Sequence, residues 1–175
     1  MGFNCSVAFS DIDINCQLSN VGGIKEVVFL SQNNLAITFD AVDETTITEV
    51  DLNDEWFRLQ HNQKDGTTVF TEKKKTTGGL GIIDTAITVR VPRIDQKLND
   101  LDYMSRREDI VAVMLHNNGT VTISGWMDGL TMDLSATSGS SLNDGSYIDV
   151  NFSCTSWIAS LALPNTSVFV NNPFA

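Results

Sequence analysis

One stretch of this sequence has the periodicity of an α-helix, and strand-like runs lie on both sides of it. Within residues 94–107, apolar side chains recur at the spacing of a single helix face, at Ile94, Leu98, Leu101 and Met104. Elsewhere the apolar residues come in short runs that are bounded by Asn, Asp, Gly and Ser, which are typical of turns. The sequence therefore predicts a mainly β fold, an antiparallel sandwich or barrel with one flanking helix at about 94–107.

Several short strand-like runs precede this helix. Residues 26–30 and 36–39 are apolar and flank a turn-prone Ser-Gln-Asn-Asn segment, which predicts a hairpin. Residues 47–52 alternate imperfectly between apolar and polar and predict a further strand. Residues 56–59 and 67–72 predict another pair of strands, because the Asp-Gly step between them suits a tight turn.

The clearest strand comes directly before the helix. Within residues 84–93, Ile87, Val89 and Val91 fall on one face of the strand and polar residues on the other. The strand is expected to end at Pro92, because proline has no N–H group to donate to a neighbouring strand.

The strongest hairpin signal follows the helix. Residues 109–116 are too continuously apolar for a strand with one exposed face. Asn117-Asn118-Gly119 then leads into a strand at 121–127, and the Asn-Gly step predicts a type I′ turn. The strand at 121–127 is also one candidate for an edge strand, and residues 130–136 are expected to continue the meander past Asp128-Gly129.

The last third of the chain ends in a long strand and a tail. Residues 147–156 place Ile148, Val150, Phe152 and Cys154 on one face. The segment 164–175 has turn composition, so this tail is expected to be loose, or to become ordered only against a neighbour.

Composition limits the classes of protein to consider. A chain of 175 residues with 42% hydrophobic residues can form one domain, 1–175. Its net charge of −11, with 11 scattered Lys and Arg residues, argues against a protein that reads nucleic-acid sequence. No signal peptide or membrane-spanning segment is recognised, so a protein that is not exported and does not contact a membrane is expected. Cys5, Cys16 and Cys154 have neither the number nor the spacing of a disulfide framework or a zinc site.

The sequence offers no familiar catalytic or cofactor-binding motif. The two histidines, His61 and His116, stand beside asparagines in turn-like sequence, and no nucleophile elbow or phosphate-binding loop is present. Residues 11–15 imitate the start of a calcium-binding loop but lack its glycine and its bidentate glutamate. The protein is therefore expected to be non-enzymatic, with no catalytic, cofactor-binding or metal-ligating residues. A hydrolase that uses scattered carboxylates is a minor alternative, which requires a pocket with a carboxyl group of raised pKa.

A polar, glycine-rich segment at 72–84 lies between two strand-like runs. It contains the only run of basic residues, Lys73-Lys74-Lys75, and the pair Gly78-Gly79. A projecting loop or hairpin arm is predicted here, and an ordinary solvated loop is the alternative.

The three tryptophans, Trp56, Trp126 and Trp157, are too dispersed to define a sugar-stacking platform and are expected in the core or in subunit contacts. A carbohydrate-binding β-sandwich remains the main alternative function. In that case Trp56, Trp126 and nearby acidic residues would form the site.

The order of features in the second half of the chain resembles a known family. The features are a buried strand, Asn117-Asn118-Gly119-Thr120, Gly125-Trp126-Met127-Asp128-Gly129-Leu130, Ser135 to Gly139, and Asn143-Asp144-Gly145 leading into the last long strand. Over roughly residues 84–163, this pattern resembles the tail-tube-like and neck-ring virion proteins of tailed bacteriophages, in particular crAss-like and related phages. Residues 22–27 show a weaker likeness.

The resemblance implies both an assembly and a location. It implies a small β-sandwich or barrel whose copies form a homo-oligomeric ring, six- or twelve-fold, by joining their sheets edge to edge around a lumen. DNA would pass through this lumen without specific binding, repelled by acidic residues, for which the candidates are Asp40, Asp43, Glu44, Glu49, Asp51 and Asp149. The resemblance further implies contacts with other tail or neck proteins, a place in the virion, and assembly in the host cytoplasm. Lys73, Lys74, Lys75, Gly78 and Gly79 are then the candidates for inter-subunit contact.

Overall fold

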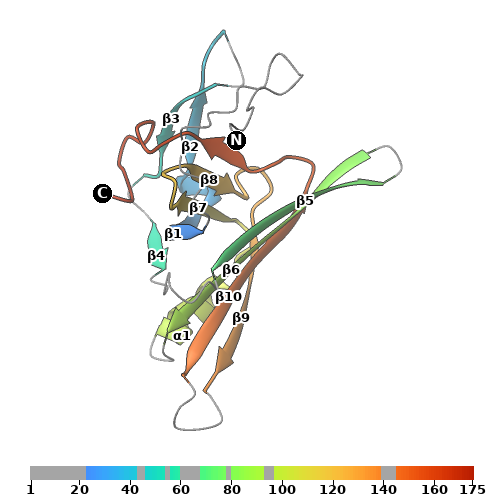
Figure 1. Ribbon diagram of the computed structural model, residues 1–175, viewed down its shortest axis with the longest axis vertical. Helices are drawn as coiled ribbons and strands as arrows, with labels where there is room; N and C mark the ends of the chain where they lie inside the picture. Colours follow the sequence, from blue (N-terminus) through green and yellow to red (C-terminus); the bar gives the residue numbers. More distant parts are fainter. Residues whose placement is uncertain are drawn as a thin grey trace, which may run out of the picture.

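The fold is described from a computed structural model of the chain, which covers residues 23–42, 46–53, 56–59, 68–77, 80–92, 97–138 and 145–175. Within these ranges the chain is mainly β, with antiparallel pairing in its sheets, one α-helix and a sandwich-like arrangement (Figure 1). This confirms the fold class that the sequence predicts.

Three sheets make up the described part of the molecule. The central sheet has the order β11-β8-β7-β1-β4. Its strands are β1 (Ile24–Ser31), β4 (Phe57–Leu59), β7 (Ile110–His116), β8 (Val121–Ser124) and β11 (Leu161–Leu163). The long sheet has the order β5-β6-β10-β9. Its strands are β5 (Val69–Thr77), β6 (Leu80–Pro92), β9 (Thr131–Thr137) and β10 (Tyr147–Ser156). The small sheet pairs β2 (Ala36–Phe39) with β3 (Ile47–Asp51).

The central sheet is the middle one of three layers, because both of its faces are buried. Alternate residues of β7 belong to different cores: Ile110, Ala112 and Met114 pack toward the long sheet. Val111 and Val113 pack toward the small sheet and the C-terminal segment. Figure 1 shows the central sheet between the long sheet below and the small sheet above. A strand buried on both faces needs an uninterrupted apolar sequence, which confirms the interpretation of residues 109–116.

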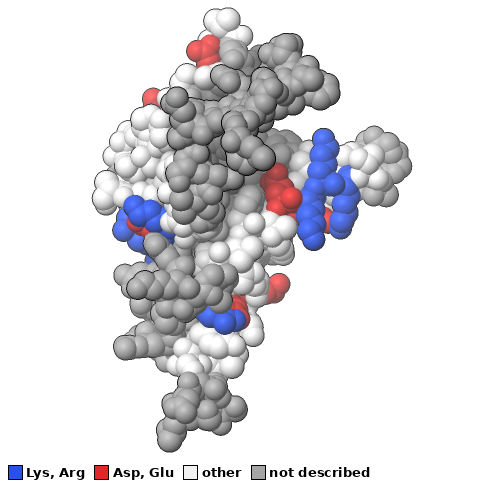
Figure 2. All heavy atoms as spheres, in the orientation of Figure 1, with Lys and Arg blue, Asp and Glu red and all other residues white. Residues whose placement is uncertain are grey.

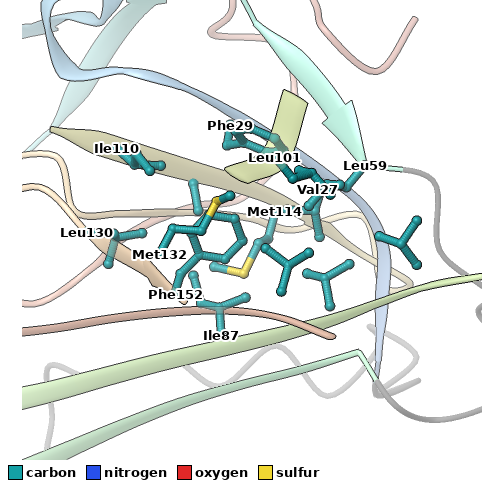
Figure 3. Packing of buried hydrophobic residues seen from close by; sticks show 14 of the residues in the cluster. Val27, Phe29, Leu59, Ile87, Leu101, Ile110, Met114, Leu130, Met132 and Phe152 are labelled. Carbon is teal, nitrogen blue, oxygen red and sulfur yellow. The ribbon is translucent and has the colours of Figure 1, made fainter. Parts of the chain in front are cut away.

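The larger core lies between the central and long sheets (Figure 3). Phe29 of β1 and Phe152 of β10 meet there with their ring centroids 5.7 Å apart. Ile87 and Val150 add apolar surface from the long sheet. Leu101 contributes from helix α1 (Lys97–Met104), so the single helix covers part of this core.

A polar cluster connects the end of β1 with the start of β7. The Asp109 carboxylate accepts two hydrogen bonds from Arg107, 2.9 Å from Nε and 2.8 Å from Nη2, and a third from the Ser31 hydroxyl. The backbone N–H of Gln32 donates to the Asp109 carbonyl at 2.7 Å. The guanidinium and the hydroxyl hold the pKa of Asp109 at about 2, below its ordinary value of 3.8.

Two glycines carry the chain from the central sheet to the long sheet. Gly125 and Gly129 have φ angles of 76° and 72°, which side chains rarely tolerate. At Gly129 a Cβ atom would lie 2.2 Å from the carbonyl oxygen of Glu108. Residues 130–136 therefore do not continue a meander beside β8, as the sequence predicts. They cross to the other sheet, where β9 pairs with β10.

Two predicted hairpins are wrong. β1 does not pair with β2: its neighbours are β7 and β4, and β2 pairs with β3. A 3-10 turn at Gln32–Asn34 takes the chain out of the central sheet. Likewise β4 pairs with β1 and not with β5, because Leu59 is buried in the larger core and Phe57 stacks on Phe29 at 5.9 Å. The connection that was expected to turn between them, with its Asp-Gly step, lies outside the described residues.

The hairpin between β7 and β8 is confirmed, but its turn type is not. Only Gly119 has a positive φ angle, 85°, whereas a type I′ turn needs two such residues. The His116 N–H donates to the Thr120 carbonyl at 2.9 Å, which makes a three-residue loop closed by glycine.

Several predicted boundaries differ from the structure, among them those of the helix and of two strands. The helix ends at Met104 and not near residue 107, and residues 93–96 lie outside the described ranges. The strand expected at 84–93 is longer, since β6 begins at Leu80, and it ends at Pro92 as the missing N–H requires. The strand expected at 121–127 ends earlier, at Ser124, before the turn at Gly125.

The C-terminal segment packs against the same chain and is not loose. Phe169 is 7% exposed and forms a parallel bridge with Val50 of β3. The Val50 N–H donates to the carbonyl of Val168 at 2.8 Å, and the Val170 N–H donates to Val50 at 3.0 Å. Arg58 donates to the carbonyl of Pro173. The tail thus completes the third layer over the central sheet.

Candidate subunit-contact surface

The predicted arm is the end of a long hairpin. β5 and β6 pair in register from Val69↔Thr88 to Thr77↔Leu80. β10 pairs with β6 only as far as Ser156↔Ile83, so the last three residue pairs of the hairpin extend past the neighbouring strand. Figure 1 shows this end projecting from the body. Residues 72–77 and 80–84 form a two-stranded ribbon and not an irregular loop, while Gly78 and Gly79 lie outside the described residues.

The base of the hairpin is fixed to the body at two points. The Glu72 carboxylate accepts a hydrogen bond from the backbone N–H of Ser160 at 2.9 Å. Phe70 packs against the larger core and meets the ring of His116 edge-on, with centroids 6.4 Å apart. A hairpin held in this way presents its far end in a defined direction.

The three lysines of the hairpin have different surroundings. Lys75 forms an ion pair with Asp84 of β6. The hydrogen bonds from Lys75 and then from Thr155 lower the pKa of Asp84. Lys74 lies over Gly81, where a Cβ atom would stand 3.3 Å from its Cε. Lys73 has no ion-pair partner within the described ranges. Figure 2 shows basic side chains gathered where the hairpin leaves the body, with acidic ones beside them.

The outer strands of the long sheet are not the strand that the sequence indicates as an edge. β8 lies between β7 and β11, so the strand expected at 121–127 has no free edge. In the long sheet the outer strands are β5 and β9. β9 runs Thr-Met-Asp-Leu-Ser-Ala-Thr, without Lys, Arg or Pro, and its register with β10 contains no bulge. Within the described residues β9 thus has only one of the devices that usually prevent edge strands from pairing, the charged side chain of Asp133.

The outer face of the long sheet is polar and balanced in charge. Alternation along the four strands places three basic and three acidic side chains on this face: Lys73, Lys75, Arg90, Asp84, Asp133 and Asp149. Arg90 donates to both carboxylate oxygens of Asp149, at 2.7 and 2.8 Å, and its guanidinium lies 3.8 Å from the centre of the Tyr147 ring. The face is therefore neutral overall.

Other acidic candidates for a lumen lie elsewhere. Glu49 and Asp51 belong to β3 of the small sheet, and Asp40 follows β2. Asp43 and Glu44 fall outside the described residues. The carboxylates singled out in the sequence are thus not gathered on the long sheet, where only Asp149 lies, in a pair with arginine.

The tryptophans do not form one platform. Trp56 and Trp126 are partly buried against the core between the central sheet and the small sheet. The indole N–H of Trp126 donates to the carbonyl of Ala159 at 3.1 Å, and its ring lies 6.2 Å from that of Phe39. Trp157 is 61% exposed. The two rings on which the carbohydrate-binding alternative depends thus contribute to packing.

The histidine and the cysteine within the described ranges, His116 and Cys154, are partly buried. Burial lowers the pKa of His116, which shares a 2.8 Å hydrogen bond with Thr122, and burial raises the pKa of the Cys154 thiol. His61, Cys5 and Cys16 lie outside the described ranges, as do residues 11–15. Within those ranges no group of three or more His, Cys, Asp or Glu residues could hold a metal ion. No helix there has the length and apolar character to span a membrane.

A shallow depression of about 630 Å³ lies beside the base of the hairpin. Its acidic residues are Asp84, Glu108 and Asp128. A hydrolase with scattered carboxylates would need a carboxyl group of raised pKa there, whereas the pKa of Asp84 is lowered by Lys75 and Thr155. The depression thus gives the hydrolase alternative no support from Asp84.

Comparison with known proteins gives no relative: no protein-family model, curated protein or solved structure matches the chain.

Proposed function

We propose that this protein is a structural virion protein of a tailed bacteriophage, which self-assembles into a ring of the tail tube or neck and forms a conduit for DNA. The proposal combines two observations: residues 84–163 resemble tail-tube-like and neck-ring virion proteins, and the long sheet has two free edges among the described residues. It assigns the protein a mechanical role without catalysis or a cofactor. Its partners are further copies of itself and neighbouring tail or neck proteins, and it would assemble in the host cytoplasm.

The observation that carries the proposal is the pair of unpaired edges on the long sheet. Among the described residues β5 and β9 are the two outer strands of a four-stranded antiparallel sheet; β5 contains the lysine run, and Asp133 is the single charged residue of β9. An open, regular edge is a site for pairing with another chain. Because the two edges differ, their pairing is head-to-tail, and head-to-tail contacts close into rings when the rotation between copies permits.

In this proposal the outer face of the long sheet lines the lumen, and the charge of that face differs from the acidic lining that the resemblance implies. A lumen lined by carboxylates would repel DNA, but this face has equal numbers of basic and acidic residues. Its other members are mostly short and polar, such as Thr88, Asn151 and Ser153. A neutral wall of this kind offers no excess of positive charge to hold phosphates, so DNA would slide along it without being bound.

The proposal is tested by following assembly against protein concentration. Wild-type protein is examined by light scattering after size separation, and the leading peak is imaged by negative-stain electron microscopy. We expect rings or stacked tubes, from which the number of subunits is counted. A monomer at every concentration would overturn the proposal and transfer weight to the carbohydrate-binding alternative, which a glycan array then tests.

A matched pair of variants separates edge pairing from general surface effects. Ser135→Lys places a lysine on the β9 edge, and Ser153→Lys places the same charge on the same face of the interior strand β10. Assembly is expected to be lost with Ser135→Lys and retained with Ser153→Lys. Equal behaviour of the two variants would argue against an edge contact.

A second variant tests the hairpin. Replacing Lys73, Lys74 and Lys75 by serine removes its basic character and is expected to weaken assembly, because the lysines face an acidic neighbouring copy. Unchanged assembly would mean that the lysines of the hairpin do not contribute to the contact between copies.

A further inference from the structure

We propose that β9 of one copy pairs with β5 of the next, with Asp133 directly opposite Lys73. This inference rests on the proposed function and specifies its interface. Strand direction and side-chain face permit this pairing, and the strand tilt of its register and the charges of the two residues favour it.

Strand direction permits a continuous sheet across the junction. Neighbouring strands in the order β5-β6-β10-β9 are antiparallel at each step. β9 therefore runs opposite to β5. A β5 strand from a second copy, placed beyond β9 in the same orientation as the first, would again be antiparallel to its neighbour.

Side-chain faces also agree. Asp133 pairs with Asn151, Asn151 with Thr88, and Thr88 with Val69, so these four residues form one row across the sheet. Side chains on a strand alternate with a period of two, which puts Lys73 on the same face as Val69. Asp133 and Lys73 thus point to the same side of a sheet that continues from one copy into the next.

The register follows from the offset between these residues. Within one copy Asp133 is level with Val69, so placing it opposite Lys73 of the next copy requires a shift of four residues over four strands. One residue per strand, at about 3.4 Å of rise and about 4.8 Å of strand spacing, inclines the strands by about 35°. Closed barrels have strand tilts of about 35–45°.

The strands within each copy are already offset along the strand direction in the same sense as the proposed shift. β5 lies along Leu80–Thr88 of β6, whereas β9 lies along Tyr147–Ser153 of β10, nearer the other end of the sheet. Each strand is thus displaced in the same direction as the proposed shift. In this register all seven residues of β9 face Val69–Lys75 of the next copy.

Charge favours this pair of edges. Neither Lys73 nor Asp133 forms an ion pair with a described residue; Lys73 faces Asp84 across the hairpin, but the Asp84 carboxylate is paired with Lys75. Opposite charges in directly facing positions stabilise a strand pair, and like charges destabilise it. Two β5 edges would bring lysines together, so the lysines direct β5 toward the acidic β9 edge.

The register is tested by disulfide cross-linking of the full chain. The double variant Lys73→Cys with Asp133→Cys is assembled, treated with an oxidant and separated by denaturing electrophoresis without reductant. Facing residues of an antiparallel pair are close enough for a disulfide, so a ladder of covalent multimers is expected. The single variants Lys73→Cys and Asp133→Cys control for the native cysteines, and Lys74→Cys with Asp133→Cys controls for the opposite face.

Charge reversal provides a second measurement. Lys73→Glu and Asp133→Lys are each expected to raise the concentration needed for half-assembly about fivefold or more, and the double variant is expected to restore it. Lys74→Glu combined with Asp133→Lys should not restore assembly, because Lys74 lies on the opposite face of the sheet. If wild-type protein forms rings while the Lys73–Asp133 double variants neither cross-link nor restore assembly, this register is wrong and the ring remains. If the wild-type protein never assembles, the proposed function itself fails.

Discussion

Replacing Asp109 by asparagine tests whether the cluster at the start of β7 stabilises the fold. A carboxyl group whose pKa is lowered from 3.8 to about 2 on folding contributes at most about 2.5 kcal/mol at neutral pH. The side chains of Arg107 and Asp109 are 48% and 31% exposed. Screening by water therefore reduces the expected loss for Asp109→Asn to about 1–2 kcal/mol.

The stabilisation by Asp109 is expected to decrease as the pH falls. Because the pKa of Asp109 is lower in the folded protein, its contribution is complete above the unfolded pKa and is lost as pH falls through about 2. The difference in unfolding free energy between wild type and Asp109→Asn should therefore shrink to about half at pH 3.

Urea unfolding followed by tryptophan fluorescence at pH 7, 4 and 3 measures this difference. Asp102→Asn is the control, because Asp102 pairs with Arg106 at 3.0 Å on the exposed side of α1, where such a pair contributes about 0.5 kcal/mol or less. A difference for Asp109→Asn that is as small as that of the control, or that does not change between pH 7 and pH 3, would refute the reasoning.

Three further substitutions and one control, Gly145→Ala, test other parts of the fold by the same unfolding measurement. Gly129→Ala should cost about 2–4 kcal/mol, since a Cβ would lie 2.2 Å from the Glu108 carbonyl at a φ of 72°; Gly145→Ala, with nothing within 4 Å of its Cβ, should be nearly neutral. Phe152→Ala should cost about 3–5 kcal/mol because the ring is fully buried between two sheets, and a loss below 1 kcal/mol would contradict that packing. Phe169→Ala should cost about 2–4 kcal/mol if the C-terminal segment is part of the third layer, and no change would mean that it is loose.

Local patterns in the sequence predicted local structure well. The hairpin from residue 109 onward, the long strand at 147–156 and the single helix all depend on neighbouring residues, and all three are present. The continuous apolar run of β7 also indicated burial on both faces, because such a strand cannot tolerate polar residues on either side.

Pairing between distant strands could not be read in the same way. β1 and β2 are adjacent in sequence, yet β1 pairs with the distant strand β7, with Phe29 opposite Ala112, for example. The composition of a run of residues predicts that the run is extended, but it does not identify the run that lies beside it in the sheet. The same limit explains why the edge strand was misplaced, since an edge is defined by the absence of a neighbour.

The candidate contact surface was predictable only in part. The lysine run and its glycines marked the hairpin because their composition differs from that of the flanking strands. Asp133 was missed, since nothing in the sequence distinguishes it from the other 21 acidic residues. Its interest arises from the register across four strands, which exists only in the folded sheet.

The position of β1 inside the central sheet has a consequence for how the protein is made. Both neighbours of β1, β4 and β7, are synthesised after it, and β7 is complete only at His116. The other side of the central sheet is covered by Phe169, which is synthesised later still. Pairing over such separations folds slowly. A nascent chain therefore carries apolar β1 residues exposed while most of the protein is translated, and the yield of folded protein should depend on chaperones that hold such segments.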